Sequence, residues 1–385
     1  MALTPAGDGS ALSTVVIAFE TEDAARRRLI SFGYSPLIAA EIAVYLAQAT
    51  DLPHFAPEIS GAMRAQGLAV EFVELDELPA RLSTLAPQRE SAIVWAMTDG
   101  VRYYRGSAVP ALARLEGFAR FGSAPTAAHI AQDKFASLAL AAAAGLAIPP
   151  TRLMEDKAEI AALGDWPPDD TLLFVKPNAL GAKIGIFADS LCKSLTEAAE
   201  RSARIWRRYR DRALVQPFIE GDDVRVSFLD LGGPFRDQLG VERIVKDPSS
   251  ETGGAFLTMK DNETLSGARD TAGARGGFGQ SRDAAFIPRM IDLRAATDRC
   301  SRRALDEIED AAERLARLAG LSGCFSLDFR VDAEGGPTFL EFEICPAVTI
   351  YDFQNYLAKR GLTLGAALAR AMRLAFARAG AIGEA

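Results

Sequence analysis

Apolar and polar positions alternate in blocks through the first part of the chain. Residues 14–19 (TVVIAF) form a β-branched apolar run that is typical of a buried strand, and residues 35–49 carry apolar positions at helical spacing. Residues 68–75 (LAVEFVEL) and 91–97 (SAIVWAM) predict two further strands. Strands that alternate with helices favour a parallel, doubly wound sheet, so we expect an N-terminal α/β domain over residues 1–128.

The pattern changes over residues 129–219. A helix that starts near Asp133 ends at Gly145 and is stopped by Pro149 and Pro150. An apolar strand, LLFVKP, follows, and after it come a glycine-containing turn, a basic helix and a second strand, ALVQPFI. This order predicts a small α+β domain.

Residues 220–385 combine strands, a long polar segment and helices. The strands VRVSFLDL and VERIVK come first, and CFSLDFRVD and PTFLEFEI come later, joined by a short turn. Residues 247–283, which separate the two pairs, are rich in glycine and polar residues, and a segment of that length inside a compact domain is usually functional or disordered. We expect a C-terminal α+β domain that ends in a helix with an apolar stripe.

Composition narrows the class of protein. A chain of 385 residues suggests two or three domains of about 100–200 residues each. The net charge of −8 argues against a nucleic-acid partner, because phosphate backbones are bound through clustered lysine and arginine. It leaves room for a local basic pocket that holds a small anion.

Targeting and metal-binding signals are weak in this sequence. The N-terminus lacks the basic start and apolar core of a signal peptide, and the apolar run from Leu138 to Ile148 is shorter than the about 20 residues that span a bilayer. The four cysteines and two histidines lack metal-binding spacing. We therefore expect a cytoplasmic protein with no membrane partner, no zinc site and no disulfide framework.

Three carboxylates occupy two neighbouring strands near the end of the chain. Glu341 and Glu343 share one strand face, and an antiparallel pairing of SLDFRVD with TFLEFEI would bring Asp328 beside them. Unpaired carboxylates there would repel one another and lose hydration. A divalent cation removes the problem, and all-oxygen ligands suit Mg²⁺ or Mn²⁺. The alternative is an edge strand whose glutamates face solvent.

A lysine and a glycine-containing turn follow one apolar strand. Lys176 ends the strand LLFVKP, and Gly181 and Gly185 lie in the turn after it. Such a turn lets backbone N–H groups approach phosphate oxygens, with the lysine as a point charge. A surface turn with a chance lysine is the alternative.

Taken together and in order, four stretches resemble the ATP-grasp ligases, most closely the D-alanine–D-alanine ligase branch, over about residues 90–357. They are AHIAQDKFAS, FVKPNALGAKIGI, LVQPFIEGDDVRV and DFRVD…FLEFEICPAVT. The resemblance implies an ATP-grasp fold of the α/β class. Its parts would be an N-terminal doubly wound domain (1–128), a small α+β lid domain (129–219) and a C-terminal α+β catalytic domain (220–385).

The resemblance implies a site for ATP built from three of these stretches. Lys134 and Lys176 would contact the phosphates, and residues 181–185 would form a flexible phosphate loop. Residues 216–219 would grip adenine, with Asp223 near the ribose. The residues expected to bind the nucleotide are Lys134, Lys176, Gly181, Lys183, Gln216, Pro217, Phe218, Ile219 and Asp223.

It also implies a metal site and catalytic cations. Asp328, Glu341 and Glu343 would hold two Mg²⁺ ions, with Mn²⁺ as a substitute. The stretch AFLTMKDN resembles the family's lid loop, which makes Lys260 a candidate to reach the γ-phosphate, and a solvated loop lysine is the alternative. Which lysine or arginine of residues 243–260 makes that contact is left open. The expected catalytic residues are Arg225, Lys260 and Arg330.

The chemistry implied by the resemblance is that of a carboxylate–amine ligase. A carboxylate attacks the γ-phosphate of ATP to give an acyl phosphate and ADP, and an amine then attacks the acyl carbon to form an amide. Phosphoryl transfer depends on positioning and charge neutralisation, and the acyl phosphate must be kept from water, for which residues 247–283 would serve as a lid.

The partners implied are small-molecule carboxylates and amines, and a homodimer is expected because family members often pair through the N-terminal domain. Two alternatives stay open at this point. One is another ATP-grasp activity, such as a phosphotransferase or a carboxylase subunit. The other is a non-catalytic ATP-binding module.

Several positions depart from the D-alanine ligase pattern. Glu343 replaces the usual asparagine ligand, Ala182-Lys183 replaces serines of the phosphate loop, and the serine/glutamate signature for the first substrate's amine is not recognisable before residue 90. Ser326 stands where the branch has an arginine, and Asp352 where it has a serine for the acceptor carboxylate.

A pocket that loses a cation and gains an anion repels a free carboxylate. We therefore expect an acceptor other than D-alanine, although Arg330 could compensate. The residues expected to contact substrate are Ser326, Thr349, Tyr351 and Asp352.

Overall fold

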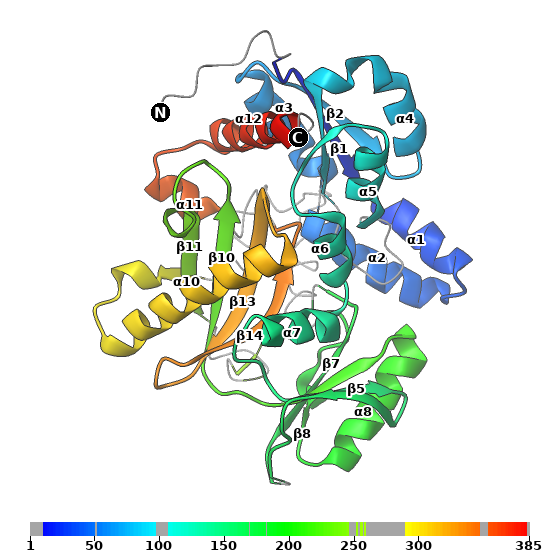
Figure 1. Ribbon diagram of the computed structural model, residues 1–385. Helices are drawn as coiled ribbons and strands as arrows, with labels where there is room; N and C mark the ends of the chain where they lie inside the picture. The colour runs from blue at the N-terminus through cyan, green and yellow to red at the C-terminus, as the bar shows by residue number, and fades with distance from the viewer. Residues whose placement is uncertain are drawn as a thin grey trace, which may run out of the picture.

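The computed structural model builds three β-sheets, one of four strands and two of five (Figure 1). Helices lie against all three sheets, so the chain is an α/β protein. The structure describes residues 11–50, 52–97, 107–168, 170–181, 183–245, 252, 255, 256, 258, 289–346 and 353–382.

The first sheet is parallel, as the alternation of strands and helices predicts, and has the order β2-β1-β3-β4. Successive residues of its central strand β1 point to opposite faces. Val15 and Ile17 enter one buried cluster and Val16 and Ala18 another, so helices cover both faces. The strands are β1 (Thr14–Phe19), β2 (Ala69–Glu74), β3 (Ala92–Ala96) and β4 (Ala119–Phe121). The helices are α1 (Glu22–Ser31), α2 (Pro36–Thr50), α3 (Leu52–Arg64), α4 (Leu78–Leu85), α5 (Ala108–Leu115) and α6 (Pro125–Ile130).

The second sheet is antiparallel and has the order β6-β5-β9-β7-β8. The amphipathic helix α8 (Leu195–Tyr209) packs Ile205 and Tyr209 against Val175 and Val215 of the sheet. Ser194 caps its first turn by accepting a hydrogen bond from the Glu197 amide. The strands are β5 (Thr151–Glu155), β6 (Ala158–Leu163), β7 (Leu173–Pro177), β8 (Leu191–Cys192) and β9 (Ala213–Pro217).

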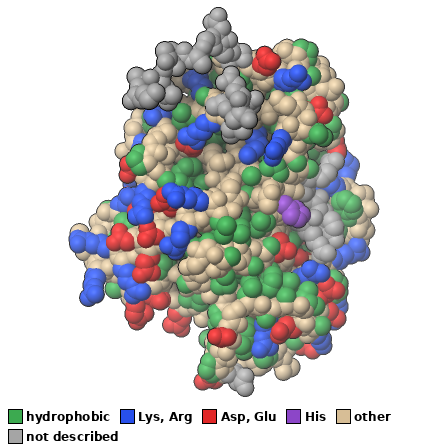
Figure 2. All heavy atoms as spheres, viewed as in Figure 1, with side chains coloured by type: hydrophobic (Ala, Val, Ile, Leu, Met, Phe, Trp, Pro, Cys, Tyr) green, Lys and Arg blue, Asp and Glu red, His purple; other side chains and the backbone are tan. Residues whose placement is uncertain are grey.

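The third sheet is also antiparallel and has the order β12-β11-β10-β13-β14. The long helix α10 (Arg299–Ala319) packs Ile308 and Leu315 onto a core that contains Phe325 and Phe329. Acidic and basic side chains alternate over the outer side of α10 (Figure 2). The strands are β10 (Asp222–Leu229), β11 (Leu239–Val245), β12 (Arg289–Asp292), β13 (Cys324–Val331) and β14 (Pro337–Glu343).

Two helices pack outside the domain in which the sequence analysis places them. Helix α7 (Lys134–Ala143), expected in the lid domain, buries Leu138 in the core of the third sheet. Helix α12 (Leu364–Ile382), at the end of the chain, buries Leu368 and Met372 in the core of the first sheet. Helix α11 (Gln354–Lys359) precedes it. The division at residues 128 and 219 stays a prediction.

The β5–β6 hairpin is the clearest element that the sequence analysis missed. Its turn contains Asp156, which adopts a left-handed φ of 54°. The turn has no glycine or proline, so the sequence carries no strong turn signal there. Aspartate tolerates that conformation better than most residues because its short side chain bonds locally.

Candidate active site

A cavity of about 200 Å³ lies between the second and third sheets. Every residue predicted to bind the nucleotide lines it. Both lysines reach it, Gly181 and Lys183 border one side, and residues 216–219 with Asp223 border another. Arg330, Glu341 and Glu343 line it as well. The fold therefore gathers residues that are far apart in the sequence into one hollow.

Lys134 occupies the first turn of α7 and is 9% exposed. A cation at a helix N-terminus faces the positive end of the helix dipole, so it needs compensation from elsewhere. Its Nζ donates to the Leu180 carbonyl at 2.8 Å and lies 3.1 Å from Oε2 of Glu341. Asp133 caps the helix by accepting a hydrogen bond from the Ala136 amide.

Lys176 lies at the end of β7 and is 7% exposed. Burial lowers the pKa of Lys176, and the carboxylate of Glu341 works in the opposite direction. The strand continues into Asn178, whose Oδ1 accepts a hydrogen bond from the Phe135 amide at 2.9 Å. This contact joins the strand that carries Lys176 to the helix that carries Lys134, so the two lysines lie close together.

The predicted phosphate loop, residues 181–185, turns sharply after this contact. Gly185 has a φ of +77°, and a Cβ there would lie 2.7 Å from Cγ of Pro177. Only glycine meets both constraints, because it has no Cβ. Lys183 also has a left-handed φ, of 62°.

The three predicted metal carboxylates lie on one face of paired strands. Strands β13 and β14 pair antiparallel, with Asp328 opposite Glu341 and Ser326 opposite Glu343. Side chains of opposite residues project to the same side. The predicted hairpin is therefore present.

Basic side chains hold these carboxylates. Arg225, from the neighbouring strand β10, binds Asp328 through two hydrogen bonds of 2.8 Å, and its Nη1 lies 3.6 Å from Glu343. Burial by itself raises the pKa of Glu341, but Lys134 and Lys176 outweigh it and lower that pKa to about 2. The face therefore carries ionised carboxylates compensated by cations.

The donor set fits a hard divalent cation, since it consists of carboxylate oxygens on adjacent strands. In the described part of the chain, however, no three acidic, histidine or cysteine side chains converge as a metal cluster. Arg225 pairs with Asp328 and Lys134 pairs with Glu341 in this structure. A bound cation would compete with those two side chains.

Arg330 organises the opposite side of the cavity. It donates to the Ile219 carbonyl at 2.8 Å and to the Ala255 carbonyl at 2.7 Å, and it is ion-paired with Asp223. Its guanidinium also lies 5.4 Å from the centre of the Phe218 ring. The structure thus places Arg330 at the predicted adenine hinge, away from the ion pairs of Asp328 and Glu341.

An aromatic cluster covers the same end of the cavity. Phe256 packs edge-on against Phe174 at 4.9 Å and lies 6.0 Å from Phe218, measured between ring centres. Gln216 is buried and donates to Oγ1 of Thr151 at 2.8 Å. These contacts provide an apolar, aromatic wall beside a polar residue, Gln216.

Sequence reasoning missed Phe174, Phe256 and Thr151. Phe174 could have been found, because it lies two residues before Lys176 and strand alternation puts both on one face. Phe256 lies within the predicted lid segment, but nothing in its spacing indicates a contact with β7. Thr151 belongs to the missed hairpin.

Four predicted residues lie outside the described residues, as does most of the predicted lid at residues 247–283. Ser326 is described. It is 1% exposed, and its Oγ lies 3.4 Å from Oε2 of Glu343. The four are Lys260, Thr349, Tyr351 and Asp352.

Comparisons with known proteins agree with this geometry. The chain is 26% identical over 293 residues to a D-alanine–D-alanine ligase from Gloeobacter violaceus, which covers 76% of this chain and 83% of that protein. It is 22% identical over 275 residues to the vancomycin B-type resistance protein VanB from Enterococcus faecalis, which covers 70% and 69%. No family model matches the chain.

Solved structures match over nearly the whole chain. A D-alanine–D-alanine ligase from Bacillus anthracis, complexed with ATP, superposes with a TM-score of 0.61 at 13% identity and covers 97% of this chain and 100% of that one. The VanG D-Ala:D-Ser ligase from Enterococcus faecalis superposes with a TM-score of 0.57 at 14% identity and covers 94% and 99%. At this identity the match establishes the fold alone.

Among the described residues, no helix combines the length and apolar character that crossing a bilayer requires.

The three sheets, the lysine-lined cavity and the relatives all point to the same class of enzyme. The chain has the ATP-grasp fold and is an ATP-dependent carbon–nitrogen ligase that resembles the D-alanine–D-alanine ligase branch.

Proposed function

We propose that this enzyme joins a small carboxylate to an amine through an acyl phosphate. A carboxylate oxygen attacks the γ-phosphorus of ATP, the bond to the bridging oxygen breaks, and ADP leaves. The amine nitrogen then attacks the acyl carbon, phosphate leaves, and the nitrogen loses a proton. The product is an amide.

The observation that carries the proposal is the pairing of two buried lysines with one carboxylate. Lys134 and Lys176 lie in one cavity beside Glu341, although they come from different elements. Buried cations beside a hollow favour an anion of high charge, and a triphosphate is such an anion. The flat ring of Phe218 and the amide of Gln216, at the other end, suit a base.

Asp328, Glu341 and Glu343 would hold Mg²⁺ in this proposal, and Mn²⁺ would substitute. The metal would neutralise charge on the phosphates during transfer. Lys134 and Arg225, which pair with these carboxylates in the structure, would then be available to the phosphates. Lys134 and Lys176 would position the phosphates, and Arg225 would neutralise charge beside them.

The described part of the predicted lid supports a covering role for residues 247–283. Phe256 packs on Phe174, and the Ala255 carbonyl accepts a hydrogen bond from Arg330. These contacts hold residues 255 and 256 beside the cavity, which supports the proposal. A lid there would keep water from the acyl phosphate.

For the acceptor, we propose an amine other than D-alanine. Ser326 is buried beside Glu343, and Arg225, whose Nη1 lies 3.6 Å from that carboxylate, is bonded to Asp328. The Glu343 carboxylate would repel the free carboxylate of an amino-acid acceptor at this position. A cationic or carboxylate-free amine suits the position better.

The test is ADP release by the purified enzyme over pairs of amino acids and amines, with Mg²⁺ and ATP. Amine-dependent release identifies the ligase reaction and its acceptor together. ATP turnover that is independent of any amine points instead to a phosphotransferase. Brisk synthesis of D-alanyl-D-alanine would reject the acceptor assignment and leave the ligase assignment standing.

A further inference from the structure

The side chain of Gln216 is held in one orientation by two consecutive hydrogen bonds. Gln216 lies on β9 and Thr151 on β5, and the antiparallel register that pairs Arg152 with Val215 places the two opposite each other. Nε2 of Gln216 donates to Oγ1 of Thr151 at 2.8 Å, and Oγ1 of Thr151 donates to the Pro149 carbonyl at 2.8 Å. The exposed fractions of Gln216 and Thr151 are 4% and 0%, so both bonds are buried.

The direction of these bonds follows from the chemistry of the groups. A carbonyl oxygen only accepts, so the single hydroxyl proton of Thr151 is used on Pro149. Toward Gln216 the hydroxyl oxygen can then only accept, and the amide must turn its NH₂ group to it. The oxygen and the nitrogen of an amide are otherwise interchangeable in shape. Thr151 therefore selects one of two orientations of the Gln216 amide.

This orientation leaves the amide oxygen of Gln216 for the nucleotide cavity. Of the two residues, Gln216 lines the cavity and Thr151 does not. Within the described residues, Oε1 of Gln216 accepts no hydrogen bond, and it is not one of the buried side-chain atoms that lack a partner. The oxygen is therefore open to the cavity. The aromatic side chains of Phe174, Phe218 and Phe256 line the same cavity.

We propose that Thr151 makes the nucleotide site selective for adenine by fixing the amide of Gln216. This inference rests on the proposed nucleotide site and adds the means by which the base is read. Adenine carries an amino group at C6, which donates a hydrogen bond, whereas guanine and hypoxanthine carry an oxygen there, which accepts. A fixed acceptor in the protein attracts the amino group and repels the oxygen. Thr151 acts through Gln216 and is a positioning residue.

Gln216 alone would not discriminate between these bases. A glutamine that is free to turn by half a rotation presents its oxygen to an amino group and its NH₂ group to a carbonyl oxygen, so it accommodates either base. Here the reversed amide would set its oxygen against the oxygen of Thr151, or would cost the hydroxyl its bond to the Pro149 carbonyl. A buried polar group left without its partner is what rejects an analogue.

The test compares the binding of ADP and of inosine diphosphate, whose base has an oxygen at C6. Purine riboside diphosphate, which has no group at C6 and keeps the acceptor at N1, is the neutral probe. Titration calorimetry with Mg²⁺ on the full-length enzyme measures all three affinities without turnover and without an amine. We expect ADP to bind at least about tenfold tighter than inosine diphosphate, the cost of one mismatched buried contact, with the neutral probe between them.

Thr151→Val keeps the shape of the side chain and removes the hydroxyl. The Gln216 amide can then turn either end to the base, so the ratio of the two affinities should fall at least about fivefold. Thr151→Ser keeps a hydroxyl and should retain the ratio of the unmodified enzyme. A general loosening of the site would weaken both nucleotides together and leave their ratio unchanged.

Gln216→Glu is the matched control for orientation. A carboxylate has two equivalent oxygens, so it presents an acceptor whichever way it is turned. The preference for ADP should persist in this variant, and adding Thr151→Val to it should not change the ratio. Such non-additivity between two contacting positions identifies orientation as what Thr151 supplies. Circular dichroism and the melting temperature check that every variant folds.

An unchanged ratio in Thr151→Val, or a lost ratio in Thr151→Ser, overturns the role of Thr151. Equal binding of ADP and inosine diphosphate by the unmodified enzyme overturns the selectivity. Absence of binding by either nucleotide at millimolar concentration overturns the selectivity and the nucleotide site together. A changed selectivity leaves the proposed ligase reaction untouched, because amine-dependent ADP release from ATP tests that reaction separately.

Discussion

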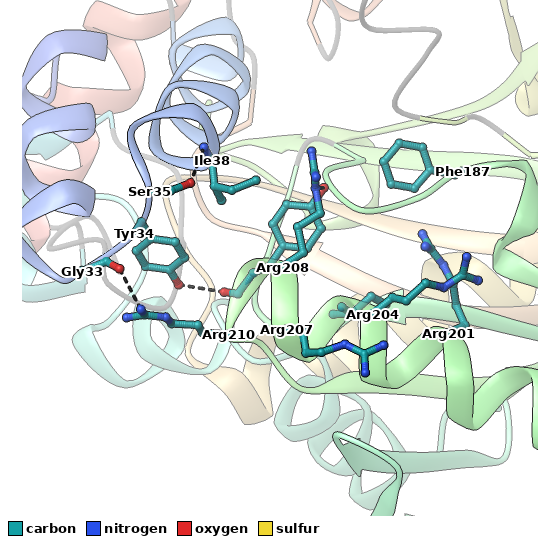
Figure 3. A pocket seen from close by; sticks show the side chains of 12 residues that line it. Gly33, Tyr34, Ser35, Ile38, Phe187, Arg201, Arg204, Arg207, Arg208 and Arg210 are labelled. Atoms are coloured by element: carbon teal, nitrogen blue, oxygen red, sulfur yellow. Dashed lines mark hydrogen bonds between the residues drawn. The ribbon is translucent and has the colours of Figure 1, made fainter.

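The nucleotide cavity and a second cavity, of about 620 Å³, are both basic, but their cations are compensated differently (Figure 3). We call the second cavity the arginine groove, because it is lined by Arg201, Arg204, Arg207, Arg208 and Arg210. In the groove, the compensating carboxylates are spread among the arginines and belong to Asp189, Glu41 and Glu200.

In the nucleotide cavity, Lys134 and Lys176 face Glu341, which comes from another sheet. In the proposed reaction, a metal-bound nucleotide would replace these contacts between lysine and carboxylate. What sets the cavity apart from the groove is that its carboxylates share one strand face and suit a hard cation.

Helix α10 shows how arginines are compensated by acids on the same helix. Arg303 pairs with Glu307, and Arg317 pairs with Glu313, each at a separation of four residues. Such pairs neutralise surface charge at little energetic gain. Helix α8 has arginines at similar density and two acids at that spacing, Glu197 before Arg201 and Glu200 before Arg204.

The largest expected effect, on ATP turnover, comes from removing the carboxylate that compensates Lys134 and Lys176 in the cavity. Glu341→Gln removes a proposed metal ligand and the carboxylate between two buried lysines. ATP turnover should fall at least about a hundredfold, whereas Arg204→Gln in the groove should leave turnover unchanged. Steady-state ADP release measures turnover in both variants. Near-normal turnover in a folded variant would remove the proposed metal site.

A smaller effect, on the KM for ATP, is expected from a change of Arg330 at the predicted adenine hinge. Arg330→Lys keeps the charge but cannot hold the Ile219 carbonyl, the Ala255 carbonyl and Asp223 together, because lysine lacks the guanidinium fork. The KM for ATP should rise about tenfold, with less change in kcat. Arg303→Lys on α10 is the control. A loss confined to kcat would place Arg330 in the chemistry instead of nucleotide binding.

Glu343→Asn should affect the enzyme less than Glu341→Gln or Arg330→Lys. The amide oxygen remains a ligand for a hard cation, and the long contact of 3.6 Å to Arg225 is what the variant loses. Turnover should change by less than about tenfold, a magnitude typical of a tuned rather than removed ligand. A loss as large as that of Glu341→Gln would make Glu343 an essential ligand in its charged form.

The smallest expected effect is on the pH dependence of the enzyme's folding stability. The pKa of Glu341 is lowered to about 2 in the folded protein, below the about 4.3 of an unfolded glutamate. Ionised Glu341 therefore stabilises the fold fully at pH values above about 4.3. This stabilisation is lost as the pH falls from about 4.3 through about 2. The urea midpoints of the unmodified enzyme and Glu341→Gln, measured with chelator, should therefore converge on acidification. A gap independent of pH would contradict the lowered pKa.

Much of the catalytic sheet was predictable because local pattern and chemistry agree there. Alternation in SLDFRVD and TFLEFEI predicted β13, β14 and the shared face of Asp328, Glu341 and Glu343. The β5–β6 hairpin was missed because Asp156 makes its turn without glycine or proline. Phe256 was missed because its ring contacts belong to a segment with no periodic pattern.

The sequence by itself determined the strands, the charged residues and their order along the chain, because hydrophobic period and turn chemistry are local. Tertiary structure decided which charges meet. Arg225 reaches Asp328 only because β10 pairs with β13 in one register, and Arg330 reaches Ile219 for the same reason. The arginine groove depends on α8 lying against the turn before α2, a contact between distant segments. Coulomb and hydrogen-bond energies depend on distance in space, and spacing along the chain does not supply it.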